Sequence, residues 1–123
     1  MIRARVIARG RIRPAVRSST EALYEQHLAA RLALGEIVWY RYEAIKLRLA
    51  DMTHYTPDYV VMLSTGEIEV HEVKGFWRDD ARVKIKVAAE MYPFRFIAVN
   101  QRPKRDGGGW EIEEIGATKR NNM

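Results

Sequence analysis

The feature that most constrains the fold is the stretch 57–74, in which two short runs of strand-forming residues are joined by a turn. Val, Ile and Tyr dominate both runs, and Ser64-Thr65-Gly66 between them supplies the small and polar residues of a β-hairpin turn. A turn centred on Thr65 places Asp58 opposite Glu72 in the paired strands. We therefore predict a hairpin whose open end carries two acidic side chains.

One face of this hairpin is apolar along most of its length and charged at its end, because side chains alternate across a strand. Asp58, Glu72 and Lys74 belong to that face. Burying such charges without a partner is costly, and a divalent cation such as Mg²⁺ or Mn²⁺ would offset the cost through carboxylate oxygens. The alternative is a half-exposed hairpin end with an ordinary ion pair. A turn one residue shorter would place Val73 opposite Asp58 instead.

The composition fits one globular domain with one modest core, since the chain has 123 residues, 47% hydrophobic and 30% charged. The absence of cysteine excludes disulfides, thiol catalysis and thiolate zinc sites. A net charge of +5 favours a polyanionic partner such as DNA, although excess Lys and Arg also promote solubility. The sequence has neither a signal-peptide core nor the roughly 18 apolar residues of a membrane span, so we expect a cytoplasmic protein without a membrane partner.

The domain organisation follows from charge and composition. Residues 1–17 are expected to form a basic N-terminal arm or edge strand, 18–116 a single domain, and 117–123 a flexible tail. The arm holds six arginines and no acidic residue, and Gly10 and Pro14 argue against a helix there. Such an arm could lie along DNA phosphates and release counterions, or it could be a solvated basic tail.

A helix is predicted from Ser18 to Leu34, with Gly35 as a left-handed cap. Ser18 and Glu21 have the S-x-x-E spacing in which the two side chains cap each other's backbone amides. Glu21 also begins the core-facing stripe of this helix, so its carboxylate can point toward the sheet and reach the acidic end of the hairpin. The alternative for Glu21 is capping alone, which contributes about 0.5 to 2 kcal/mol.

The rest of the chain predicts more strands and a second helix. We expect a long strand over 37–49, a connector over 50–56, a helix from Asp79 or Asp80 to about Tyr92, and strands over 94–100 and 110–115. Val83, Val87 and Met91 form the apolar stripe of the second helix. Together these elements indicate an α/β fold, with a central mixed sheet of about four or five strands flanked by helices.

Asp58, thirteen intervening residues and Glu72-Val73-Lys74, preceded by a helix with Glu21, resemble the active-site pattern of the PD-(D/E)XK nuclease superfamily. The runs 55–58 and 72–80 are similar to those of phage endonuclease I, a type of Holliday-junction resolvase. Small phage and prophage endonucleases of the superfamily are similar at Glu21, at 34–37 and in the lysine-rich second helix. The resemblance covers roughly residues 17–99. It implies a restriction-endonuclease-like core with the order α-β-β-β-α-β.

The resemblance also implies roles for individual residues. Asp58 and Glu72 would bind Mg²⁺ with the main-chain carbonyl of Val73, and Mn²⁺ would substitute for it. Lys74 would position or deprotonate the attacking water, and Glu21 would complete a second metal position or hold a metal-bound water. DNA contacts are expected near the starts of both helices, from Arg17, Ser18, Trp77, Arg78, Arg82, Lys84 and Lys86. For the second helix, a solvated basic face is the alternative.

The function implied is hydrolysis of DNA phosphodiester bonds by a magnesium-dependent endodeoxyribonuclease of phage or prophage origin, acting in DNA recombination. Branched DNA such as a Holliday junction is the expected substrate, and a homodimer would be needed to cut two junction strands symmetrically. Two alternatives are open. One is a nuclease for flaps, nicked duplexes or single strands, and the other is a catalytically inactive DNA-binding module of the same fold.

Overall fold

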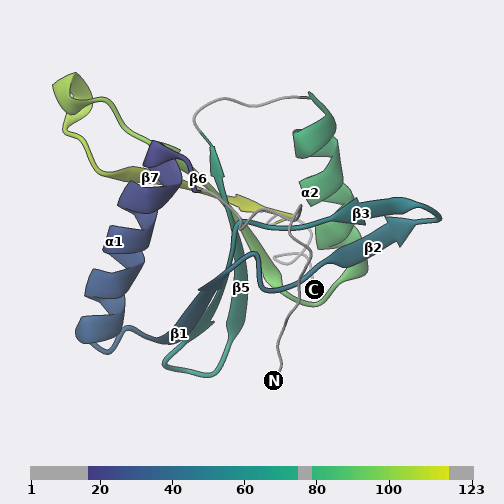
Figure 1. Cartoon of the computed structure of the whole chain (residues 1–123), viewed down its shortest axis with the longest axis horizontal. Helices are drawn as coiled ribbons and strands as arrows, with labels where there is room; N and C mark the ends of the chain where they lie inside the picture. Colours follow the sequence, from purple (N-terminus) through teal and green to yellow (C-terminus); the bar gives the residue numbers. More distant parts are fainter. Residues whose placement is uncertain (1–16, 75–78, 117–123) are drawn as a thin grey trace, which may run out of the picture.

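The computed structural model describes residues 17–74 and 79–116, in which two α-helices lie on opposite sides of one central sheet (Figure 1). The sheet has five strands in the order β1-β4-β5-β6-β7. Their bounds are Ile37–Tyr42 for β1, Tyr59–Leu63 for β4, Ile68–Lys74 for β5, Arg95–Gln101 for β6 and Trp110–Ile115 for β7. β5 and β6 are parallel and the other neighbours are antiparallel, so the predicted α/β class with a mixed central sheet is confirmed.

Helix α1 (Ser19–Ala33) begins where its capping signal predicts. Ser18 Oγ accepts from the Glu21 backbone N–H at 3.1 Å, and Glu21 Oε1 accepts from the Ser18 N–H at 2.8 Å. At the other end, Gly35 has φ of +79°, a conformation that costs glycine little. The predicted helix and both of its ends are confirmed.

The two faces of the sheet bury separate apolar clusters. On one face, Tyr24 and Leu28 of α1 pack against Tyr59 and Val61 of β4. On the other face, Ile85 of α2 (Asp79–Met91) packs among residues of the sheet and of a small hairpin, which include Val70, Phe96, Leu47 and Tyr55. The sheet is therefore the middle layer of the domain.

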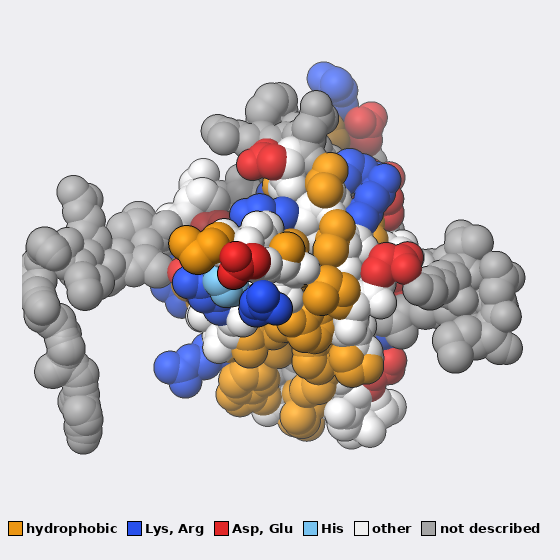
Figure 2. All heavy atoms as spheres, turned by 90° about the vertical axis from the view of Figure 1, so that its right-hand side faces the viewer, with side chains coloured by type: hydrophobic (Ala, Val, Ile, Leu, Met, Phe, Trp, Pro, Cys, Tyr) orange, Lys and Arg blue, Asp and Glu red, His pale blue; other side chains and the backbone are white. Residues whose placement is uncertain are grey.

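The apolar stripe predicted for α2 faces outward. Val83, Val87 and Met91 are 58%, 36% and 51% exposed, whereas Ile85 and Ala88 are fully buried. The small Ala88 side chain faces the sheet beside Ile85, so the larger apolar residues at the 83, 87 and 91 positions are left on the surface. Figure 2, which shows the side of α2, has hydrophobic side chains gathered on this face with Lys and Arg around them.

The prediction of one long strand over 37–49, followed by a connector, is wrong. The sheet strand β1 ends at Tyr42, and Glu43 takes a positive φ of +48° while its N–H donates to the Asp58 carbonyl at 2.8 Å. This turn directs the chain off the sheet edge into a separate hairpin. Its strands are β2 (Leu47–Ala50) and β3 (Thr53–Tyr55). Tyr92, which directly follows α2, donates its hydroxyl to the Arg48 carbonyl at 2.6 Å and so ties this hairpin to the helix.

The β4–β5 hairpin has the predicted register. Tyr59 pairs with His71 and Val60 with Val70, so the same register continued by one residue brings Asp58 opposite Glu72. Gly66 turns the chain with φ of +93°. The open end of the hairpin therefore carries both carboxylates.

A 3₁₀ turn, η2 (Lys104–Asp106), precedes β7. Within 17–74 and 79–116, no helix has the length and apolar character that a membrane span requires. Apart from Arg17, the predicted basic arm lies outside the described residues, as does the predicted tail over 117–123.

Candidate functional site

Three charged side chains predicted to act together meet at the open end of the β4–β5 hairpin. Asp58 lies directly before β4, while Glu72 and Lys74 lie at the end of β5. Glu72 is only 8% exposed. Since Glu72 follows Val70 by two residues, it lies on the face of the sheet that also carries α2 and the β2–β3 hairpin.

Both oxygens of the Glu72 carboxylate are held by neighbours. Tyr55 at the end of β3 donates its hydroxyl to Oε1 at 2.6 Å, and the Lys74 ammonium lies 2.8 Å from Oε2. Burial and the Glu72 charge raise the pKa of Tyr55, so its hydroxyl keeps its proton and acts as a donor. The Glu72 carboxylate is thus fixed in orientation.

Asp58 sits in a strongly negative environment. The Val73 N–H donates to its Oδ2 at 2.8 Å. Burial and then the charge of Glu72 nevertheless raise the pKa of Asp58 to about 8, and Glu21 adds to the rise. Burial, together with the nearby Glu72 and Glu21 carboxylates, therefore outweighs the single backbone hydrogen bond in setting the pKa of Asp58.

Glu21 reaches this cluster from a different part of the chain. Its Oε1 accepts from the Ser18 N–H and, at 3.2 Å, from the Tyr42 hydroxyl, and its carboxyl group is close enough to contribute to the raised pKa of Asp58. Capping and membership of the carboxylate cluster were alternatives on sequence grounds. In the structure, the same side chain does both.

The cluster, which we define as Glu21, Asp58, Glu72 and Lys74, has three carboxylates and one ammonium. An excess of buried negative charge attracts a cation, and hard oxygen donors suit Mg²⁺ or Mn²⁺. Across the described ranges, no three Asp, Glu or His side chains surround one point closely enough to hold a metal by themselves. A cation here would therefore need main-chain oxygen or water among its ligands.

The residues predicted to contact DNA divide into several groups. Arg17 forms an ion pair with Glu25 and lies 4.3 Å from the centre of the Tyr42 ring, while Ser18 is used in the helix cap. On α2, Arg82 donates to Glu113 at 2.9 Å, Lys84 is half-buried and Lys86 is exposed. Trp77 and Arg78 lie outside the described residues.

Two features of the structure were not predicted from the sequence. The first is the Tyr55 contact with Glu72. The second is a buried network on the α1 face: the Tyr24 hydroxyl lies 2.6 Å from His71 Nδ1, His71 Nε2 lies 2.9 Å from Glu69, and Arg95 donates to Glu69 at 2.8 Å. This network joins α1 to β5 and β6 through polar contacts on the face opposite Glu72.

The Tyr55 contact makes a prediction about stability. Tyr55→Phe is expected to lower the free energy of unfolding by about 1.5 to 3 kcal/mol, because the hydrogen bond to a buried charged group is lost. Tyr92→Phe is the matched control, since it removes a hydroxyl bonded to an exposed main-chain carbonyl and should cost about 1 kcal/mol. Urea denaturation measures both, and equal losses would contradict the assignment.

Comparisons with models of protein families, with curated protein sequences and with solved structures give no match to this chain.

Proposed function

We propose that this chain is a metal-dependent endodeoxyribonuclease of the PD-(D/E)XK superfamily. The observation that carries the proposal is the convergence of Asp58, Glu72 and Lys74 at one hairpin end with Glu21 from a separate helix. The order of a helix, an antiparallel meander, a second helix and a parallel strand supports a restriction-endonuclease-like core.

The donor set fits a hard divalent cation. Asp58 and Glu72 would hold Mg²⁺ together with the Val73 carbonyl, and Glu21 would act on a bound water. This fits an ion that keeps several of its waters and is usually bound through one or two carboxylates. The ion would lower the pKa of a bound water and stabilise the charge that develops on the phosphate.

The protein residues contribute position and charge. The Lys74 ammonium, which lies 2.8 Å from Glu72, would hydrogen-bond the attacking water or the phosphate oxygen beside it. Tyr55 and the Val73 N–H keep the two carboxylates oriented. The water would attack phosphorus directly and give up a proton, while the P–O bond to the leaving sugar oxygen breaks and that oxygen takes up a proton, so no covalent enzyme intermediate is required in a chain without cysteine.

The proposed substrate is branched DNA such as a Holliday junction, cut by a homodimer that presents two equivalent sites. The net charge of +5 supports a polyanionic substrate. A nuclease acting on flaps, nicked duplexes or single strands would use the same cluster, and phage or prophage recombination is the proposed setting.

The test is a cleavage panel with labelled DNA. A synthetic four-way junction, a flap, a nicked duplex, a single strand and a linear duplex of matched sequence are incubated with Mg²⁺, with Mn²⁺ and with chelator. We expect metal-dependent cutting of the junction at a rate at least about tenfold above that of the linear duplex. Binding of every substrate without cutting under either metal would contradict the proposal and favour an inactive DNA-binding module.

A further inference from the structure

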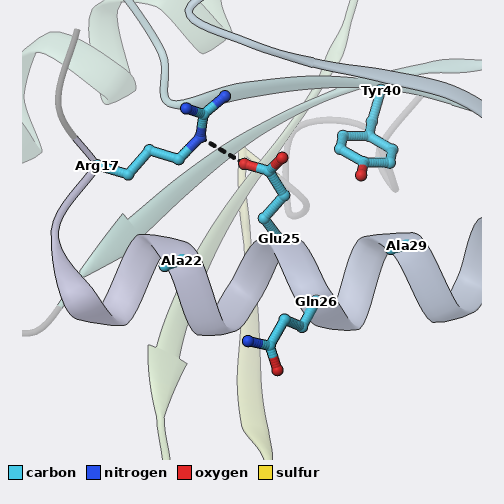
Figure 3. A pocket seen from close by; sticks show the side chains of 6 residues that line it. All are labelled: Arg17, Ala22, Glu25, Gln26, Ala29 and Tyr40. Carbon is cyan, nitrogen blue, oxygen red and sulfur yellow. Dashed lines mark ion pairs between the residues drawn. The ribbon is translucent and has the colours of Figure 1, made fainter.

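A pocket of about 400 Å³ opens between α1 and β1 at the edge of the sheet. Figure 3 shows Arg17 and Glu25 facing each other in an ion pair, with the Tyr40 ring further along the same side of the helix. The pocket is lined by Arg17, Ala22, Glu25, Gln26, Ala29 and Tyr40. Apolar and aromatic surface is thus combined with one amide and one ion pair between a cation and a carboxylate.

Both walls of the pocket, α1 and β1, also carry residues of the cluster or in contact with it. On α1, Glu25 follows Glu21 by four residues, which is about 6 Å along a helix. On β1, Tyr40 precedes Tyr42 by two residues, about 6.6 Å along a strand, and the Tyr42 hydroxyl contacts Glu21. One nucleotide of an extended DNA strand spans a comparable distance.

The wall nearest the cluster is held in place by shared contacts. The Tyr59 hydroxyl lies 2.8 Å from Glu25 Oε1 and 3.2 Å from the main-chain oxygen of Glu21. Arg17 pairs with the same Glu25 and stacks over Tyr42. The pocket and the cluster are therefore built on one set of rigid contacts.

The chemistry of the lining suits a planar heterocycle. Tyr40 is half-buried and offers an aromatic face, and the planar Arg17 guanidinium, which pairs with Glu25, lies in the same lining. The Gln26 amide, which has no hydrogen-bond partner among the described residues, can both donate to and accept from a base edge. A paired base in duplex DNA cannot enter such a pocket, because its faces and edges are already occupied.

We propose that this pocket binds an unpaired nucleobase next to the phosphate that is cut. The inference rests on the proposed function and sharpens it, because it makes an unpaired nucleotide beside the cut part of substrate recognition. Flaps and single strands supply such a nucleotide directly, and a junction supplies one when the base pairs at its centre open, whereas a continuous duplex does not. Stacking on an aromatic residue is tolerant of sequence, so selection would be for DNA structure.

The test measures binding without hydrolysis. Fluorescence anisotropy with chelator present compares a labelled single-stranded oligonucleotide with a duplex of the same sequence. Tyr40→Leu should weaken single-strand binding about tenfold, the usual scale for one stacked base, and leave duplex binding unchanged. Tyr40→Phe keeps the ring and should bind as the parent protein does.

Trp39→Leu is the matched control. Trp39 is an exposed aromatic on the same strand but does not line the pocket, so its replacement should leave both affinities unchanged. Gln26→Ala, at an exposed helix position that tolerates substitution, should weaken single-strand binding about threefold even if Tyr40→Leu fails to fold.

Equal losses on single strand and duplex, or no loss with Tyr40→Leu and Gln26→Ala, would overturn the inference. Because no metal is present, this outcome is independent of whether the protein cuts DNA. A failed nuclease assignment appears instead as absence of cutting in the cleavage panel.

Discussion

Asp58→Asn is expected to reduce DNA cleavage by at least about a thousandfold while the protein stays folded. The change removes a proposed metal ligand, and the loss of one preorganised electrostatic group in an active site costs about 10² to 10³ in rate even without a metal. Asparagine has nearly the shape of the protonated Asp58 carboxyl group, which a pKa of about 8 favours near neutral pH, and its amide oxygen can still accept from the Val73 N–H, so the fold has no reason to suffer. Cutting of a four-way junction in Mg²⁺ and circular dichroism measure the two effects.

Asp51→Asn is the matched control, because the same chemical change is made at an exposed position beside the β2–β3 turn. It should leave cutting unchanged. Glu72→Ala and Lys74→Ala should abolish cutting as well, with DNA binding largely retained. Undiminished cutting by Asp58→Asn or Glu72→Ala would refute the proposed metal ligands, and a Lys74→Ala protein that loses binding alone would make Lys74 a phosphate contact.

Without metal, the protein is expected to lose stability as the pH rises from about 4 to about 8. Folding raises the pKa of Asp58 to about 8, from an ordinary value of about 3.9, so the folded state holds this proton more tightly than the unfolded chain. The contribution of this proton to the free energy of unfolding is complete below the pKa of Asp58 in the unfolded chain. It is lost as the pH rises through the pKa of Asp58 in the folded state. Tm measured at pH 4 to 9 in chelator should show the decline.

Mg²⁺ should reverse much of this decline above pH 7, because a cation bound by the folded state raises its stability by mass action. Asp58→Asn should flatten the pH dependence and remove the response to Mg²⁺. A parent protein whose Tm is unchanged by Mg²⁺ at pH 8 would argue against a cation at the cluster. A pH profile identical in the parent and Asp58→Asn would show that another group controls the titration.

The parts of the fold that were predictable are those encoded locally. The Ser18–Glu21 cap, Gly35 and the turn around Thr65 each act over a few residues, and they set the ends of α1 and the register that brings Asp58 opposite Glu72. The break after β1 depends on Glu43 adopting a positive φ, which is uncommon outside glycine and asparagine. No local signal predicts it.

The predictable residues of the site are likewise those that stand out in the local sequence. Three cluster residues, Asp58, Glu72 and Lys74, stand out in sequence because acidic and basic side chains end an apolar hairpin face, and Glu21 stands out through its S-x-x-E spacing at the start of a core-facing helix stripe. Tyr55 does not, since its contact with Glu72 requires β3 to fold back from the sheet edge. The sequence predicts the apolar stripe of α2 but not that it faces outward, because Val and Met at helical spacing look alike on a buried and on an exposed face.

Glu21 belongs both to the first turn of α1 and to the charge cluster, so fraying of the helix end is linked to the electrostatic environment of Asp58. The helix cannot fray at its N-terminus without withdrawing a carboxylate from beside Asp58. Local opening of this turn would therefore change the electrostatic potential at the cluster as well as the end of the helix. A ligand that orders Ser18 and Arg17 would thereby tune the acidity of Asp58 without touching it.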